Sequence, residues 1–282
     1  MNEPISHHFV PVFYLSNWCE SNGMVPFSMR RDDCSIFQSR VKPSETAFEN
    51  RLYSYEKVPK KQRQAVEKLF FTAEVDTKAA PILRKIVTGE IGILSPEERA
   101  DWTRFLIAAR LRVPEIVHDL KKTATEELRR SLTEDHEEYL AVKGAVNAPT
   151  LLAWAERKFV GLTDNFGMMI LPDIITDPNH TGIIAGMNWW MEDVSGANVQ
   201  LLTSDRPLWV STGLMKPNCL LALPLSPTHI FFASRNGDLQ TALHRVGTNR
   251  LARRCNESIA SQAARFVYGR AEAAFIDRRL GR

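Results

Sequence analysis

The chain has no apolar run near the length of a membrane span. Roughly 18 to 20 consecutive apolar residues are needed to cross a bilayer, and no stretch of this sequence approaches that length. Its first residues, MNEPISHH, also lack the basic leader and the apolar core of a secretory signal. These absences predict a cytoplasmic protein that does not associate with a membrane.

Cysteine is scarce as well. The four cysteines, at positions 19, 34, 219 and 255, lie far apart and form no C-x-x-C pair. This spacing argues against a thiolate zinc site and, in a reducing compartment, against disulfides. We expect the cysteines to pack as small apolar side chains.

Neither sign of charge dominates the sequence. The formal net charge of +3 is small for 282 residues, whereas a dedicated nucleic-acid-binding protein usually has a larger and more clustered basic excess. Basic residues do gather locally, as in residues 57–63 (KVPKKQR), but solvated helix faces commonly have this composition. Charge alone therefore nominates no nucleic-acid partner, and we interpret residues 57–63 as a solvated face.

Several nucleotide and metal motifs are also absent. The sequence contains no G-x-x-x-x-G-K-[ST], no G-x-G-x-x-G and no H-E-x-x-H. Walker-type nucleotide hydrolysis and dinucleotide oxidoreduction therefore lose support, and so does zinc chemistry of the H-E-x-x-H or thiolate kind.

The first hundred residues predict a hairpin followed by helices. Residues 24–30 and 35–41 are short strand-like segments separated by Arg31-Asp32-Asp33. From residue 60, apolar residues at 66, 69, 70 and 73 repeat with the spacing of one buried helix face, and Glu74 lies at the edge of that face. Pro81 is expected to kink or restart this helix, because proline removes a backbone donor.

Three further helices follow. Ser95-Pro96-Glu97-Glu98 is a capping box and predicts a helix that ends near Arg112. Residues 115–132 predict a charged helix that faces solvent over most of its circumference. Asn147-Ala148-Pro149 predicts the start of another helix, which runs to about residue 160.

After residue 165 the pattern changes to strand-like runs divided by turn residues. These runs are 166–171, 187–192, 199–202, 208–210, 220–223 and 230–234. A helical pattern returns from residue 248 to about 279, with Asn256 on its buried stripe.

This order of elements predicts an α+β fold. We expect an antiparallel sheet formed by the N-terminal hairpin and the C-terminal strands, with a central helical segment and a closing C-terminal helix. The composition, 44% hydrophobic and 24% charged, is that of an ordinary globular protein. We therefore expect a single domain over residues 1–282, with a helix-rich insertion at about 60–162.

Five segments of the chain, taken together, resemble a known family. They are HHFVPVFYLSNW, PSETAFENRLYS, AEVDTKAAPILRKI, LLTSDRPL followed by LPLSP, and RRCNESIASQAARFVYG. In this order they resemble the landmarks of the bacterial family called domain of unknown function 4238, over nearly the whole chain. H-H-x-V-P-x-F-Y-L and T-S-D-x-P are the specific parts of the resemblance.

The resemblance implies a fold and candidate positions, but no established activity. The implied polar landmarks are His7, His8, Tyr14, Asn17, Glu49, Asn50, Glu74, Arg112, Ser204, Asp205, Ser226 and Asn256.

The candidate catalytic residues are His7, His8, Glu74 and Asp205. An imidazole suits proton transfer or metal binding near neutral pH. Adjacent residues on an extended strand point to opposite sides, so we expect only one histidine to be functional. Glu74 lies beside an apolar helical stripe, and Asp205 follows a predicted strand, where sites are common.

The candidate substrate-binding residues are Asn50, Arg112, Ser204 and Asn256. A guanidinium such as that of Arg112 would offset the charge of a phosphate. Each candidate residue also has a structural interpretation. Residues 203–207 suit a turn whose Ser and Asp side chains bond the backbone, Glu74 could pair with Arg112, and Asn256 could make a core hydrogen bond.

Two functions from different classes fit these residues. The first is a hydrolase acting on a phosphodiester or a nucleotide, in which the candidate residues provide acid, base or divalent-metal-ligand roles. The alternative is a non-catalytic protein that senses a ligand or partner, in a bacterial stress or phage-defence system. Its contact surface would be the aromatic N-terminal segment and Trp189-Trp190, although paired tryptophans more often fill a core.

Overall fold

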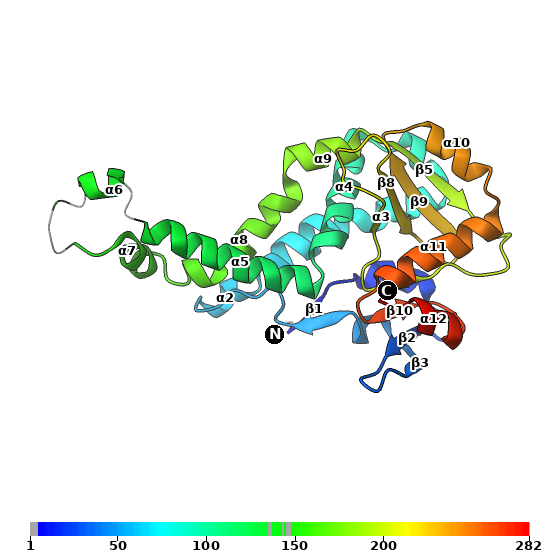
Figure 1. Cartoon of the computed structure of the whole chain (residues 1–282), viewed down its shortest axis with the longest axis horizontal. Coiled ribbons are helices and arrows are strands. Elements are labelled where there is room, and N and C mark those ends of the chain that lie inside the picture. Colours follow the sequence, from blue (N-terminus) through cyan, green and yellow to red (C-terminus); the bar gives the residue numbers. More distant parts are fainter. Residues whose placement is uncertain (1–4, 135–136, 143, 145–147, 282) are drawn as a thin grey trace.

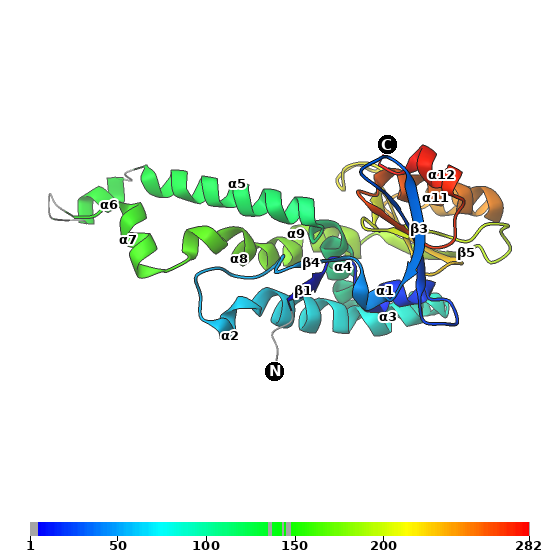
Figure 2. The ribbon, with the colours of Figure 1, turned by 90° about the horizontal axis from the view of Figure 1, so that it is seen from below.

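The computed structural model describes residues 5–134, 137–142, 144 and 148–281. It confirms an α+β fold, in which the central part of the chain is helical and the strands pair antiparallel (Figure 1). The two four-stranded sheets lie at one end of the molecule, and α5 to α8 extend from the other end as an arm. In that arm α5 and α8 run side by side (Figure 2).

The helices in the described residues are α1 (Val12–Leu15), η1 (Ser16–Trp18), η2 (Pro43–Glu45), α2 (Lys60–Arg63), η3 (Val66–Asp76), α3 (Thr77–Val87), η4 (Glu90–Ile93), α4 (Pro96–Leu111), α5 (Pro114–Thr133), α6 (Glu137–Val142), α7 (Leu151–Lys158), α8 (Leu162–Thr176), α9 (Pro178–Ala185), α10 (Asp238–His244), α11 (Thr248–Gln262) and α12 (Ala273–Arg279). The strands are β1 (Ser6–His8), β2 (Val25–Arg30), β3 (Ile36–Val41), β4 (Phe48–Asn50), β5 (Asn188–Asp193), β6 (Thr203–Ser204), β7 (Trp209–Val210), β8 (Leu220–Pro224), β9 (His229–Ser234) and β10 (Phe266–Tyr268).

The predicted N-terminal hairpin exists and pairs with strands from the C-terminal part of the chain. The hairpin strands β2 and β3 continue into β10 and then β6, giving the order β3-β2-β10-β6. Val267 of β10 lies opposite Ser28 on one side and Ser204 on the other. This pairing brings the N-terminal and C-terminal parts of the chain together.

The later strands form a second sheet whose two faces are both covered. Its order is β5-β9-β8-β7. On β9, Phe231 packs into the main core with Trp102 of α4, whereas Phe232 packs into a second cluster with Ile259 of α11. A strand covered on both faces has a continuous apolar run, and this is the pattern that predicted β8 and β9.

Trp189 and Trp190 each fill one of these two cores. Their exposed fractions are only 7% and 3%. Trp189 belongs to the main cluster and Trp190 to the cluster under α11. The suggestion that this pair forms a contact surface is therefore wrong.

Three strand or helix boundaries differ from the sequence prediction. Residues 166–171 lie within helix α8, where Met168, Leu171 and Ile175 are buried at helical spacing, so this short apolar run was misread as a strand. Helices thus continue to Ala185, beyond the predicted insertion. Residues 199–202 are not a strand, and strand β6 begins at Thr203, directly after them.

The predicted closing helix is divided into two. Helix α11 ends at Gln262, strand β10 follows, and α12 begins at Ala273. The chain leaves the helix because backbone N–H groups at 264–266 bond to the Asp205 carboxylate instead of continuing the helical ladder.

The first predicted helix of the central segment has an unusual winding. Residues 66–76 form a π-helix, η3, whose hydrogen bonds run from i to i+5. Its buried residues are Val66, Phe71 and Val75, at spacings of five and four, and Leu69 is 69% exposed. The face predicted from an α-helical period is therefore wrong at Leu69 and at Ala73, which is also exposed. The α-helical winding resumes at Thr77, four residues before Pro81.

The strongest local prediction is confirmed. Ser95 accepts a hydrogen bond from the Glu98 N–H, and the Glu98 carboxylate accepts one from the Ser95 N–H. Helix α5 buries only Val117 and Ala124, as expected of a charged, solvent-facing helix. The predicted helix start at Asn147 lies outside the described residues, and α7 is capped by Thr150. No helix in the described residues is long and apolar enough to span a membrane.

Candidate functional site

The two N-terminal histidines have different environments. Strand β1 pairs with β4, which places His7 opposite Glu49 and His8 opposite Phe48. The buried His7 ring accepts a hydrogen bond at Nδ1 from the Tyr53 N–H, so Nε2 carries the hydrogen that it donates to Gln64 Oε1. This ring is neutral and ties β1 to the residues before η3.

His8 faces a different neighbourhood and is half-buried. Its Nε2 lies 3.3 Å from the Ser44 carbonyl oxygen, and its ring packs edge-on against Phe48. Burial lowers the pKa of His8 below the usual histidine value, and nearby Arg112 acts in the same direction. His8 is thus a neutral packing side chain near neutral pH.

Arg112 lies in the core. It has no exposed surface, its Nη1 donates to Asp76, and its guanidinium packs near Phe71 and Phe105. The suggested ion pair between Glu74 and Arg112 is wrong. Glu74 is an exposed residue that pairs with Lys78, because the π-helical winding turns Asp76 inward instead.

The buried polar groups around Arg112 are incompletely paired. Within the described residues, Nε and Nη2 of Arg112 and Oε2 of Glu67 have no hydrogen-bond partner. Burial raises the pKa of Glu67 to about 7, with Arg112 opposing the shift. Glu67 is therefore the carboxyl group of this cluster that titrates near neutral pH.

In residues 203–207 the Ser and Asp side chains bond the backbone, as the structural interpretation of this segment proposed. Both Asp205 carboxylate oxygens accept backbone N–H groups, from Ala264, Arg265 and Phe266, at 2.6–2.9 Å. Burial raises the pKa of Asp205 above the usual aspartate value, although these three donors stabilise its charged form. Ser204 Oγ bonds the backbone of Arg206 in a tight turn.

The two remaining candidates have simple contacts. The Asn256 amide donates to the Gln200 carbonyl and accepts from the Leu202 N–H, which is a satisfied core hydrogen-bond pair. Asn50 lies at the end of β4, where its Oδ1 is 3.5 Å from Ser6 Oγ. The roles of all eight candidates in catalysis or substrate binding remain predictions.

Four of the five segments that carry the family resemblance meet at one cavity. We call it the motif cavity; its volume is about 290 Å³. It is lined by Phe9, Phe48, Glu49, Val113, Pro114, Glu115, Asp205, Arg206, Arg265 and Phe266. Of the candidate residues, the cavity takes in Asp205 alone.

The motif cavity contains two arginines and a carboxylate, Glu49, that contacts a histidine outside the lining. Glu49 Oε1 lies 2.9 Å from Nε2 of His118, which follows Glu115 by one turn of α5. Arg206 lies 3.5 Å from Glu115, and its Nε is a buried atom without a partner in the described residues. Arg265 lies over the ring of Phe266. The cavity therefore offers two guanidinium groups to an anion, and one of its lining carboxylates, that of Glu49, contacts His118 outside the lining.

Sequence reasoning missed His118 and Arg265. Glu115 and His118 are three residues apart on one helix, directly after Pro114, so their common face was readable from the sequence. Nothing local indicated that this face meets Glu49, since the contact joins residues 69 positions apart.

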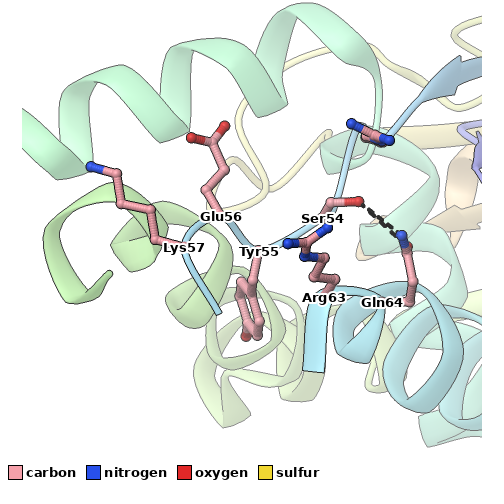
Figure 3. Close-up of a pocket in the computed structure, with 7 residues that line it drawn as sticks. Ser54, Tyr55, Glu56, Lys57, Arg63 and Gln64 are labelled. Atoms are coloured by element: carbon pink, nitrogen blue, oxygen red, sulfur yellow. Dashed lines mark hydrogen bonds between the residues drawn. The ribbon is translucent and has the colours of Figure 1, made fainter. Parts of the chain in front are cut away.

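A second cavity is lined in part by Gln64, the hydrogen-bond partner of His7. We call it the cationic pocket; its volume is about 310 Å³. It is lined by Arg51, Ser54, Tyr55, Glu56, Lys57, Arg63 and Gln64 (Figure 3). Gln64, which accepts the hydrogen bond from His7, also bonds the hydroxyl of Ser54 at the wall of this pocket.

The donor sets in the described part of the chain do not fit a divalent ion. No three His, Cys, Asp or Glu side chains among these residues come together as a cation site. In the motif cavity, Asp205 is occupied by three N–H donors and Glu49 by His118.

Comparison with known proteins gives a family but no activity. No curated protein and no solved structure matches the chain. A family described as "Protein of unknown function (DUF4238)" matches residues 6–273, which is nearly the whole chain. The resemblance seen in the sequence is thereby confirmed, and the protein belongs to this family of unknown function.

Proposed function

We propose that the protein is a hydrolase that acts on a nucleotide or another phosphodiester in the motif cavity. The observation that carries this proposal is the His118–Glu49 pair at the edge of a cavity that also contains Arg206 and Arg265. A histidine oriented by a carboxylate is a recurrent general base, and guanidinium groups match phosphate geometry.

The proposal requires a particular proton position on His118. Nε2 lies 2.9 Å from Glu49 Oε1, so in the proposed reaction the imidazole hydrogen is on Nε2 and the lone pair is on Nδ1. In the proposed reaction Nδ1 takes a proton from water while the water oxygen bonds to phosphorus. The bond between phosphorus and the leaving oxygen breaks, and the imidazolium returns its proton to that oxygen.

The other lining residues suit the substrate. Arg206 is held only by a half-exposed Glu115 at 3.5 Å, a weak surface pair that a phosphate can displace. The rings of Phe9, Phe48 and Phe266 offer apolar faces for a nucleobase.

Asp205 is a positioning residue in this proposal. Its carboxylate is occupied by the backbone of the segment that presents Arg265 and Phe266 to the cavity. His8 is also a positioning residue, because its ring packs edge-on against the ring of Phe48. His7 and Glu74 are absent from the lining of this cavity.

The test is hydrolysis of bis(4-nitrophenyl) phosphate and of a panel of nucleoside mono-, di- and triphosphates. We expect turnover by the wild type and a loss of about 100-fold or more in kcat for His118→Ala, with a large loss for Glu49→Gln. His180→Ala is the matched control, because His180 is an equally exposed histidine beside a carboxylate, Asp177, on α9.

Two results would contradict the proposal. One is turnover that requires a divalent ion and survives His118→Ala, which would favour a metal-assisted reaction at other residues. The other is stabilisation by a nucleotide without turnover of any compound, which would favour the ligand-sensing alternative.

A further inference from the structure

The cationic pocket shares no lining residue with the motif cavity. Arg51, Lys57 and Arg63 contribute three positive charges, against the single carboxylate of Glu56. Ser54, Tyr55 and Gln64 add uncharged polar groups. The pocket therefore has a net positive lining with several hydrogen-bond donors.

Two of the three cations are available to a ligand. Arg51 is exposed and has no ion pair within the described residues. Arg63 uses its Nε in a long contact of 3.4 Å with the Val58 carbonyl, which leaves both terminal nitrogens open. Lys57 is paired with Asp164 at 2.7 Å. Figure 3 shows Arg63 beside Ser54 in the pocket, with Lys57 pointing away along the loop.

The loop that carries these residues is braced from several directions. The Asn165 side chain bonds both the N–H and the C=O of Glu56. Lys121 Nζ lies 2.6 Å from the Leu52 carbonyl, and the Tyr55 N–H donates to the Arg63 carbonyl. A fixed loop reduces the ordering cost of binding, because its side chains start from one backbone position.

The backbone of this loop is also strained. Arg51 and Lys57 have left-handed φ values of 60° and 55°. For residues with a Cβ this conformation is unfavourable, because the Cβ approaches the following carbonyl oxygen. The fold thus holds two cationic residues in a conformation that glycine or asparagine would adopt more easily.

We infer that the cationic pocket binds a phosphate-bearing small molecule through its di- or triphosphate group. Arginine favours phosphate because its planar donors bond two oxygens at once, and the volume suits a small ligand. Residues 57–63 are then only partly the solvated face expected from the sequence. Lys60 and Lys61 are exposed and absent from the lining, whereas Lys57 and Arg63 line the pocket.

The test is calorimetric titration of the full chain with inorganic phosphate, pyrophosphate, tripolyphosphate and sulfate at constant ionic strength. We expect tripolyphosphate and pyrophosphate to bind, and sulfate to bind at least tenfold more weakly. In the Arg51→Gln/Arg63→Gln variant, polyphosphate binding should weaken at least tenfold while the melting temperature without ligand is unchanged.

Two controls separate this site from the others. Lys60→Gln/Lys61→Gln removes two charges from the same basic run and should leave polyphosphate binding unchanged. Arg265→Gln alters the motif cavity instead, so a loss of polyphosphate binding in Arg265→Gln with none in Arg51→Gln/Arg63→Gln would place the binding in the motif cavity and overturn the inference. Absence of polyphosphate binding, equal binding of sulfate, or equal weakening in Lys60→Gln/Lys61→Gln would each overturn the inference, whatever the outcome of the hydrolysis assay.

Discussion

The guanidinium of Arg112 is bound in the core by the carboxylate of Asp76, 36 residues earlier in the chain. Nη1 lies 2.9 Å from Oδ1 and 3.2 Å from Oδ2. The Arg112 carbonyl also accepts a hydrogen bond from the buried Tyr53 hydroxyl, whose ring stacks on His7. The N-terminal motif is thereby connected to the ends of η3 and α4.

This pair predicts a large difference between two neighbouring acids. Asp76→Ala leaves a buried guanidinium unpaired and should lower the free energy of unfolding by about 3–5 kcal/mol. Glu74→Ala removes an exposed pair with Lys78 and should leave the free energy of unfolding nearly unchanged. Urea unfolding of both variants checks this, and equal destabilisation would show that the Asp76 pair is energetically unimportant.

Glu67 predicts that stability falls as pH rises towards neutrality. Its pKa in the fold is about 7, against 4.5 for a solvent-exposed glutamate in an unfolded chain. The folded state therefore binds the proton more tightly, so this stabilisation is complete below about pH 4.5 and is lost as pH rises through about 7. Glu67→Gln should remove this slope and raise stability at pH 8 by roughly 1–3 kcal/mol.

The measurement is urea unfolding of the wild type and Glu67→Gln between pH 5 and 8. Glu74→Gln is the matched control, because its carboxylate is exposed and its pKa is lowered by Lys78. If the wild type and Glu67→Gln have parallel pH profiles, Glu67 does not titrate in this range.

Asp205 predicts a local effect on strand β10. Asp205→Ala leaves the partly buried N–H groups of 264–266 without their acceptor, and a donor that stays shielded from water without a partner costs about 1–3 kcal/mol. Unfolding free energy should fall by at least about 2 kcal/mol, and hydrogen exchange at Phe266 should accelerate. Asp277→Ala, at an exposed acid paired with Arg30, serves as the control. Unchanged exchange at Phe266 would contradict the anchoring role.

The two histidines should respond differently to alanine. His7→Ala removes two buried hydrogen bonds, to Tyr53 and Gln64, and should destabilise the fold by roughly 2–4 kcal/mol. His8→Ala removes one long contact and part of a ring packing, and should cost about 1 kcal/mol. Thermal unfolding of both variants checks that His7→Ala is the more destabilised. A larger loss of stability in His8→Ala would contradict this prediction.

The sequence predicts local features better than contacts between distant residues. The capping box at Ser95 depends on four consecutive residues, and the hairpin 24–41 on a short turn, so both were readable from the sequence. The winding of η3 was not readable in this way, and it is this winding that turns Asp76, and not Glu74, towards Arg112. Similarly, β10 interrupts a helical pattern because Asp205, some sixty residues earlier, captures its N–H groups.

The candidate site shows the same limit. Asp205 was found by its position after an apolar run, and it does line the motif cavity. His118, which the proposal makes the general base, has no local motif. It is identified only through its contact with Glu49 on a strand from another part of the chain.

Glu49 and Arg51 are two residues apart at the end of β4, yet one lines the motif cavity and the other the cationic pocket. A ligand that shifts Arg51 therefore acts on the same short segment that positions Glu49. Suppose that a ligand bound in the cationic pocket changes the affinity of the motif cavity for its own ligand by some factor. Thermodynamic reciprocity then requires that a ligand bound in the motif cavity changes the affinity of the cationic pocket for its ligand by the same factor. Measuring either affinity with and without the other ligand gives the coupling free energy between the two sites.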